Sequence, residues 1–188
     1  MMDLFDLKQA CRKAGFAQRK LAHERGFEAD ANAQLTNFLK QVEDDKIIAL
    51  YMPIRTEVSP LPTMERLARR GRKLCLPVVV GEAKPLEFRR YHPDDPLVEG
   101  VFGAAIPKEG AVMVPDIIVA PLVAFDAYGY RLGYGGGYYD RSFAQISAQK
   151  DILAVGYAYS DQEVMMVPRE STDFQLNAVI TEKGALTF

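Results

Sequence analysis

The sequence is poor in the residues that make disulfides and zinc sites. Its two cysteines, Cys11 and Cys75, lie far apart and provide neither a disulfide framework nor a metal knuckle. Its two histidines, His23 and His92, have no cysteine or carboxylate partner at ligand spacing, so they are given no catalytic role. These scarcities indicate a reducing compartment, and we expect a cytoplasmic protein.

The sequence also lacks an excess of positive charge and any long uncharged run. With 23 Lys and Arg residues against 25 Asp and Glu residues, its formal net charge is -2, so no global field would attract nucleic acid or anionic membranes. No stretch reaches membrane-spanning length, and Asp3, Asp6 and Lys8 interrupt the region where a signal peptide would be apolar. We therefore expect small-molecule or protein partners, with no nucleic acid and no membrane.

The apolar pattern predicts alternating helices and strands in a single monomeric domain, residues 1–188. Helices are predicted twice between residues 4 and 42, with an interruption near Gly26, and again at 61–70 and 138–148. Strand-like runs occupy residues 46–52, 73–80, 86–91, 116–125, 152–158 and 177–181. This alternation implies an α/β protein with a mostly parallel sheet, in which the longest run, 116–125, should be central. Residues 93–110 are expected to be an irregular surface insertion that forms a lid or a pocket wall.

A glycine-rich segment between the longest strand and a helix is the most informative part of the chain. Gly133, Gly135, Gly136 and Gly137 can turn consecutive backbone N–H groups toward one anion, and the following helix N-terminus adds its positive dipole end. Arg131 before these glycines could bind phosphate oxygens, and Asp140 after them could hold a divalent cation. Ligands of open α/β sheets bind beyond the carboxyl ends of strands, which is where this segment falls.

A flexible surface turn is the plain alternative for this segment. Neither the Walker A nor the Rossmann glycine spacing is matched, and glycines alone would favour a turn. The residues beside the glycines favour a binding loop, because a turn needs no aromatic and oppositely charged residues at fixed offsets. These residues are Arg131, Tyr138, Tyr139 and Asp140.

The segment resembles the signature of 5-formyltetrahydrofolate cyclo-ligases. The residues that carry this likeness are Phe125-Asp126, Gly129 and the run 131–140, Arg-Leu-Gly-Tyr-Gly-Gly-Gly-Tyr-Tyr-Asp. Other matches occur in order along the chain: Lys8 with Arg12, Tyr51-Met-Pro with Glu57-Val58, Pro168 with Asp173, and Thr181-Glu182. The resemblance implies a single three-layer αβα domain with a mostly parallel sheet, similar to the NagB/RpiA/CoA-transferase-like fold.

The resemblance also implies a reaction and its site residues. The reaction would be the ATP- and magnesium-dependent cyclisation of 5-formyltetrahydrofolate, with or without a polyglutamate tail, to 5,10-methenyltetrahydrofolate. Arg131, Lys8 and Arg12 would be catalytic. ATP would be bound by Lys8, Arg12, Arg131, Leu132, Gly133, Tyr134, Gly135, Gly136, Gly137, Tyr138 and Tyr139. Met52, Glu57 and Tyr139 would bind the folate, and Asp140 and Asp173 would converge beside the triphosphate to bind magnesium.

Residue by residue, plainer interpretations stay open. Lys8 and Arg12 could belong to a solvated helix face, Glu57 could be a surface loop carboxylate, and Asp173 could be a turn residue. Family members often carry an aromatic residue and an acidic-Pro step before the main strand, whereas residues 101–110 here read Val-Phe-Gly-Ala-Ala-Ile-Pro-Lys-Glu-Gly. Another small-molecule ligase or kinase on the same scaffold, a non-catalytic nucleotide- or folate-binding protein, and an isomerase or acyl-CoA transferase related by fold alone are the alternatives.

Overall fold

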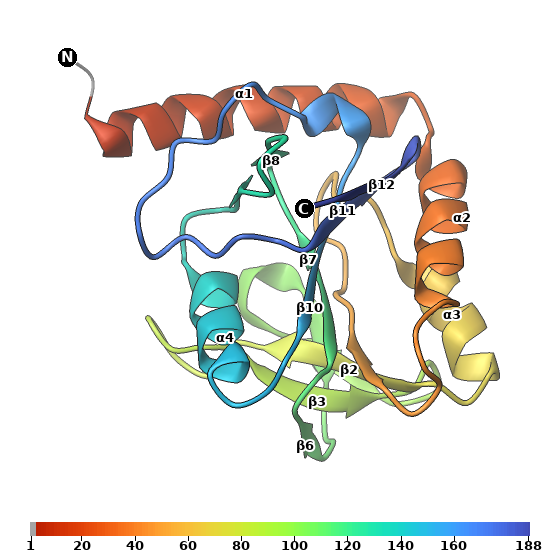
Figure 1. Cartoon of the computed structure of the whole chain (residues 1–188). Helices are drawn as coiled ribbons and strands as arrows, with labels where there is room; N and C mark the ends of the chain where they lie inside the picture. The colour runs from red at the N-terminus through yellow and green to blue at the C-terminus, as the bar shows by residue number, and fades with distance from the viewer. Residues whose placement is uncertain (1–2) are drawn as a thin grey trace.

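The computed structural model describes residues 3–188 and is built around one large twisted sheet (Figure 1). The sheet has eight strands in the order β12-β11-β10-β7-β1-β2-β3-β6. The five inner strands from β11 to β2 run parallel, whereas β12, β3 and β6 are antiparallel to their neighbours. The strand bounds are β1 Ile47–Ala49, β2 Lys73–Val78, β3 Glu87–Tyr91, β6 Val112–Met113, β7 Ile117–Pro121, β10 Leu153–Tyr157, β11 Ala178–Thr181 and β12 Gly184–Thr187.

Helices cover both faces of the sheet and one of its ends. Helices α2 (Glu28–Leu39) and α3 (Leu61–Arg69) lie on one face, and α4 (Tyr138–Ser147) lies on the other (Figure 1). The long helix α1 (Leu4–Glu24) runs across one end of the sheet, and Gly26 at φ 78° turns the chain into α2. No helix within residues 3–188 combines the length and the apolarity needed to cross a bilayer.

The inner strands are apolar on both sides because both sides are covered. Ile48 and Leu50 point into the core beneath α2 and α3, whereas Ala49 between them points into the core beneath α4. This alternation is the period of two that a pleated strand imposes. Near-continuous apolar runs therefore identified the parallel strands correctly, and β7, fourth in the sheet order, is central as predicted.

The structure corrects two expectations. The run 116–125 is not one strand, because the chain leaves the sheet after Pro121 and forms a separate ribbon in which β8 (Ala124–Phe125) pairs with β9 (Arg131–Leu132). The segment 93–110 is not irregular, because β4 (Leu97–Glu99) and β5 (Ala105–Pro107) form an antiparallel hairpin. A short 3-10 turn, η1 (Val101–Gly103), lies at its tip.

Candidate functional site

The candidate site lies at the carboxyl end of the parallel strands, under α1. Strand β7 leads there into the β8–β9 ribbon, and the glycine loop 133–137 connects that ribbon to α4. After β10 the chain passes through η2 (Ser160–Gln162) and then through a long connection, residues 163–177, to β11. We call residues 163–177 the strap. Helix α1, the glycine loop and the strap thus meet at the edge where α/β proteins bind ligands (Figure 1).

The glycine loop has a backbone that other residues could not easily adopt. Gly135 has φ 105° and Gly137 has φ 63°, both in the region that favours glycine. A Cβ atom on Gly135 would lie 3.2 Å from the guanidinium carbon of Arg12, so the loop also passes close under that side chain. Gly137 is the N-cap of α4 and supplies no side-chain cap. The first N–H groups of α4 are therefore available to an anion.

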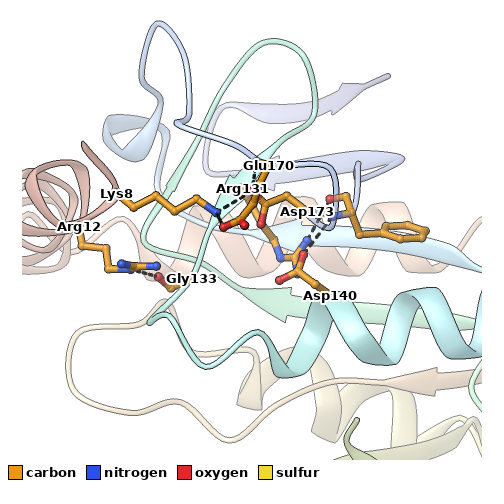
Figure 2. A network of polar contacts seen from close by, with 8 residues as sticks. Lys8, Arg12, Arg131, Gly133, Asp140, Glu170 and Asp173 are labelled. Atoms are coloured by element: carbon orange, nitrogen blue, oxygen red, sulfur yellow. Dashed lines mark hydrogen bonds and ion pairs between the residues drawn. The ribbon is translucent and has the colours of Figure 1, made fainter. Parts of the chain in front are cut away.

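Arg131 and Asp140 tie the two ends of the glycine loop together (Figure 2). Arg131 Nη2 donates to Asp140 Oδ1 at 2.9 Å, and Nη1 donates to the carbonyl oxygen of Phe174 at 3.1 Å. The same Asp140 oxygen accepts from the Phe174 amide at 3.0 Å. Burial lowers the pKa of the Arg131 guanidinium and Asp140 opposes that shift, yet a guanidinium keeps its charge in proteins. A fixed positive charge therefore lies beneath the loop.

Lys8 and Arg12 on α1 reach toward the same region, as the four-residue spacing predicted (Figure 2). Lys8 Nζ contacts Glu170 Oε1 at 2.7 Å and Asp173 Oδ2 at 2.8 Å, both on the strap. Burial lowers the pKa of Lys8, but its hydrogen bonds to Asp173 and Glu170 outweigh that effect and leave the pKa raised. Arg12 Nε donates to the Gly133 carbonyl oxygen at 3.0 Å. Lys8 thus reaches the strap and Arg12 reaches the glycine loop, so neither lies on a freely solvated helix face.

The carboxylates fit a magnesium ion that also takes phosphate oxygens and water. Asp140 uses Oδ1 for Arg131 and Phe174, and Asp173 uses Oδ2 for Lys8 and the Glu170 amide. Their other oxygens make no hydrogen bond with residues 3–188 and can act as ligands. Across those residues no three His, Cys, Asp or Glu side chains are gathered for a metal. Magnesium commonly takes one or two protein carboxylates together with phosphate oxygens and water.

Glu57 forms a second, more buried part of the site after β1. Its side chain is 3% exposed, and Oε2 accepts from the Ile54 amide at 2.9 Å. Burial raises the pKa of Glu57, and the backbone hydrogen bond from Ile54, the charge of Arg19 and the hydroxyl of Tyr134 oppose that rise. A buried carboxylate at a strand end is suited to accept hydrogen bonds from a ligand.

Tyr139 and Met52, the other two residues expected to bind the folate, are each packed against the core. The Tyr139 ring packs on Phe143 with 5.9 Å between centroids. Burial raises the pKa of Tyr139 well above its usual value, with a further rise from the charge of Glu57. Met52 is partly buried against the core beneath α2 and α3. Each of the two residues can pack in this way and still contact a ligand. Their binding of folate stays a prediction.

Sequence reasoning missed Arg19 and Glu170. Arg19 seemed no different from its charged neighbours, although it lies on the same helical face as Lys8, Gly15 and Ala22, all of which are buried. That spacing was the signal that could have identified it. Glu170 had no such signal, because only the folded strap brings it to Lys8.

Asp126 was quoted for the resemblance without a role, and the structure shows what it holds. Its side chain is fully buried, and Oδ1 accepts from the amides of Tyr128 and Tyr130, at 3.0 Å each. Oδ2 accepts from the Val167 amide at 2.9 Å. Asp126 therefore joins the turn that leads to Arg131 to the strap that carries Asp173.

Comparisons with known proteins agree with the family likeness of the motif. The model of the 5-formyltetrahydrofolate cyclo-ligase family matches residues 7–182. The 5-formyltetrahydrofolate cyclo-ligase of Escherichia coli is 38% identical over 140 residues, which cover 71% of this chain and 76% of that protein. The enzyme of the same name from Mycolicibacterium smegmatis is 28% identical over 190 residues, covering 95% of both.

Solved structures of similar proteins extend the agreement to the fold. The NMR structure of Aquifex aeolicus 5,10-methenyltetrahydrofolate synthetase aligns with a TM-score of 0.77 and 33% identity, covering 96% of this chain and 92% of that one. A 5,10-methenyltetrahydrofolate synthetase from Mycoplasma pneumoniae aligns with a TM-score of 0.71 and 27% identity, covering 96% and 99%.

Proposed function

The chain belongs to the 5-formyltetrahydrofolate cyclo-ligase family, and from this we propose that it converts 5-formyltetrahydrofolate and ATP to 5,10-methenyltetrahydrofolate, ADP and phosphate. The observation that carries the proposal is that Arg12 contacts the glycine loop, Arg131 links its two ends through Asp140, and Lys8 contacts the neighbouring strap. Three cations beside open backbone amides suit a triphosphate. Glu57 lies in a separate, buried part of the same strand edge and suits a second, uncharged ligand group.

The reaction proceeds in two steps whose atoms balance. The formyl oxygen attacks the γ-phosphorus of ATP, the bond from that phosphorus to the bridging oxygen breaks, and ADP leaves. The resulting N5-CH-O-phosphate is an iminium-type electrophile. N10 then attacks the formyl carbon and gives up its proton, the carbon–oxygen bond breaks, and phosphate departs with the original formyl oxygen. The ring closes as the N5=CH–N10 cation.

The chain's part in this chemistry is positioning and charge neutralisation, because no protein nucleophile is needed. Arg131 offers a buried planar guanidinium to the transferred phosphoryl group, and the first amides of α4 orient its oxygens. Lys8 and Arg12 hold the rest of the triphosphate, which would compete with Asp173 and Gly133 for them. Asp140 and Asp173 would hold magnesium, which when bound neutralises phosphate charge.

Glu57 fixes the folate. Its carboxylate accepts hydrogen bonds from pterin N–H groups, and Met52 and Tyr139 supply apolar surface beside it. A ligand oriented in this way presents its formyl group to the phosphate loop, and exclusion of water from the buried site protects the phosphorylated intermediate from hydrolysis.

The test is to mix the protein with 5-formyltetrahydrofolate, ATP and magnesium and to follow methenyltetrahydrofolate by its near-ultraviolet absorbance, with a reaction lacking ATP as the blank. We expect ATP-dependent product whose rate at limiting magnesium falls sharply in Asp140→Asn and is retained in Asp151→Asn, whose side chain is exposed outside the site. A folded protein that binds ATP but gives no product would overturn the proposal.

A further inference from the structure

Arg19 lies between the proposed nucleotide loop and the proposed folate carboxylate. Its side chain is 1% exposed although it comes from a highly charged helix. Nη2 donates to the Tyr134 hydroxyl at 2.7 Å, and Nε donates to Thr56 Oγ1 at 3.1 Å. Tyr134 belongs to the glycine loop, and Thr56 immediately precedes Glu57. One guanidinium therefore contacts both parts of the site.

The guanidinium lies beside two aromatic rings that also contact each other. Its central carbon lies 5.3 Å from the Phe16 ring centroid and 5.4 Å from the Tyr134 ring centroid. Phe16 and Tyr134 contact each other with 5.2 Å between centroids. Cation–π attraction of this kind holds an arginine near the rings, while its N–H groups still bond to other partners.

One N–H group of Arg19 is left without a partner. Nη1 is buried and makes no hydrogen bond within residues 3–188, and it stops 3.7 Å from Glu57 Oε1. Buried polar groups are nearly always satisfied, so an arginine that served only to hold the fold would be expected to close this gap. A movement of less than an ångström would make the contact a hydrogen bond, about 2.7–3.2 Å long.

We propose that Arg19 is a positioning residue that couples the glycine loop to Glu57, so that nucleotide and folate bind cooperatively. When the loop closes on a triphosphate, the Tyr134 hydroxyl shifts and the guanidinium follows it. Nη1 then closes on Glu57 and fixes the carboxylate for the pterin. This inference rests on the proposed function, since it takes the ligands of both parts from it.

Thermodynamic linkage makes the coupling measurable in both directions. If the nucleotide tightens folate binding by some factor, folate must tighten nucleotide binding by the same factor. Couplings of this kind commonly amount to about 5- to 150-fold. The coupling factor is the ratio of two dissociation constants, so a variant that only weakens one ligand or loosens the fold leaves it unchanged.

The experiment measures the Kd of 5-formyltetrahydrofolate by calorimetry with and without a saturating non-hydrolysable ATP analogue and magnesium, and then the reciprocal pair. In the unaltered protein we expect at least a fivefold coupling. In Tyr134→Phe, which keeps the ring but removes the hydroxyl, the factor should fall to about one, and Arg19→Lys should do the same. Tyr128→Phe, which alters a 55% exposed tyrosine, is the matched control and should keep the factor.

Each outcome decides one of the two proposals. If the unaltered protein binds no folate, the proposed function fails and the coupling fails with it. If it binds both ligands with a factor of one, or if Arg19→Lys keeps the full factor whatever Tyr134→Phe does, the coupling role of Arg19 is wrong while the proposed function stands.

Discussion

Arg131 Nη2 lies 2.9 Å from Oδ1 of Asp140, so the guanidinium that precedes the glycine loop is bonded to the carboxylate that follows it. The Arg131 side chain is 4% exposed and that of Asp140 is 26% exposed. The pair holds the two ends of the loop together and keeps the Arg131 charge at its base. Loop geometry and phosphate affinity should therefore depend on the same contact.

We expect Arg131→Met to abolish measurable turnover and to lower the free energy of unfolding by about 3 kcal/mol, because Asp140 loses its buried partner. Urea unfolding and the methenyltetrahydrofolate assay measure the two effects. Arg70→Met removes an exposed arginine at the C-cap of α3 and should change neither. Turnover within a factor of two of the unaltered protein would show that Arg131 does not act on the phosphoryl group.

Lys8 should affect nucleotide binding, since its ammonium reaches from α1 to Asp173, one of the two proposed magnesium ligands. Lys8→Met removes a charged donor worth about 1.5–3 kcal/mol, which corresponds to a roughly 10- to 100-fold weaker affinity for an ATP analogue. Lys13→Met is the matched control, because Lys13 is exposed on the same helix. Calorimetric titration with the analogue and magnesium gives both values, and equal affinities in the two variants would exclude a role for Lys8 in nucleotide binding.

Much of the architecture was predictable because parallel strands covered on both faces are continuous apolar runs. The run 73–80 predicted β2, and the helical spacing at 61–70 predicted α3. The break after Pro121 was not predictable from periodicity, because residues 122–125 are as apolar as the strand before them and are buried in other contacts. The 97–107 hairpin was missed since its residues are mostly exposed and show no alternation.

The site was predictable to the extent that it lies within one segment. The glycine loop, Arg131 and Asp140 are close in sequence, so their types and spacing indicated phosphate binding. The contact of Lys8 with Glu170 joins residues far apart in the chain, and no local pattern encodes it. Arg19 is an intermediate case. Helical spacing could have predicted that it lies on the buried face of α1, but not that it contacts Tyr134.

Asp140 should determine how much magnesium the reaction needs. Asp140→Asn keeps an oxygen for the Phe174 amide but removes the charge. Loss of a residue that merely supports a metal ligand lowers metal affinity roughly 10- to 100-fold, and loss of a ligand itself should cost at least as much. We expect the magnesium concentration at half-maximal rate to rise by about that factor, while Asp151→Asn leaves it unchanged. A chelator should stop turnover of the unaltered protein, and full activity in excess chelator would contradict magnesium dependence.

Folate affinity should depend on pH through Glu57. The pKa of Glu57 is raised, chiefly by burial, above its usual value of 4.5. Only the ionised carboxylate accepts hydrogen bonds at both oxygens, so folate affinity should be full above the raised pKa and should fall as the pH drops through it. The loss should therefore begin at a higher pH than for an ordinary glutamate.

The measurement is the Kd of 5-formyltetrahydrofolate across this range for the unaltered protein, Glu57→Gln and the exposed-site control Glu82→Gln. Glu57→Gln should bind folate about 10- to 100-fold more weakly at neutral pH, since it loses a charged hydrogen bond. Its affinity should no longer fall as the pH drops through the pKa of Glu57, because glutamine does not titrate. An unchanged pH profile in Glu57→Gln would place folate recognition on other groups.

Asp126 should matter for the fold and for the site together, because it joins the turn before Arg131 to the strap. Asp126→Asn can keep an oxygen toward the Tyr128 and Tyr130 amides, but it then turns an NH2 group toward the Val167 N–H. One charge-assisted hydrogen bond is lost and a buried donor is left unsatisfied, which costs about 2–3 kcal/mol of unfolding free energy. Urea unfolding measures this, with Asp151→Asn as the control.

The strap also carries Glu170 and Asp173 to Lys8, so the same variant should weaken binding of the ATP analogue several-fold under conditions where the protein is still folded. Stability within about 0.5 kcal/mol of the control, the range usual for surface substitutions, would mean that the strap is held by its other contacts. In that case Lys8 and its carboxylates position the strap, and Asp126 does not.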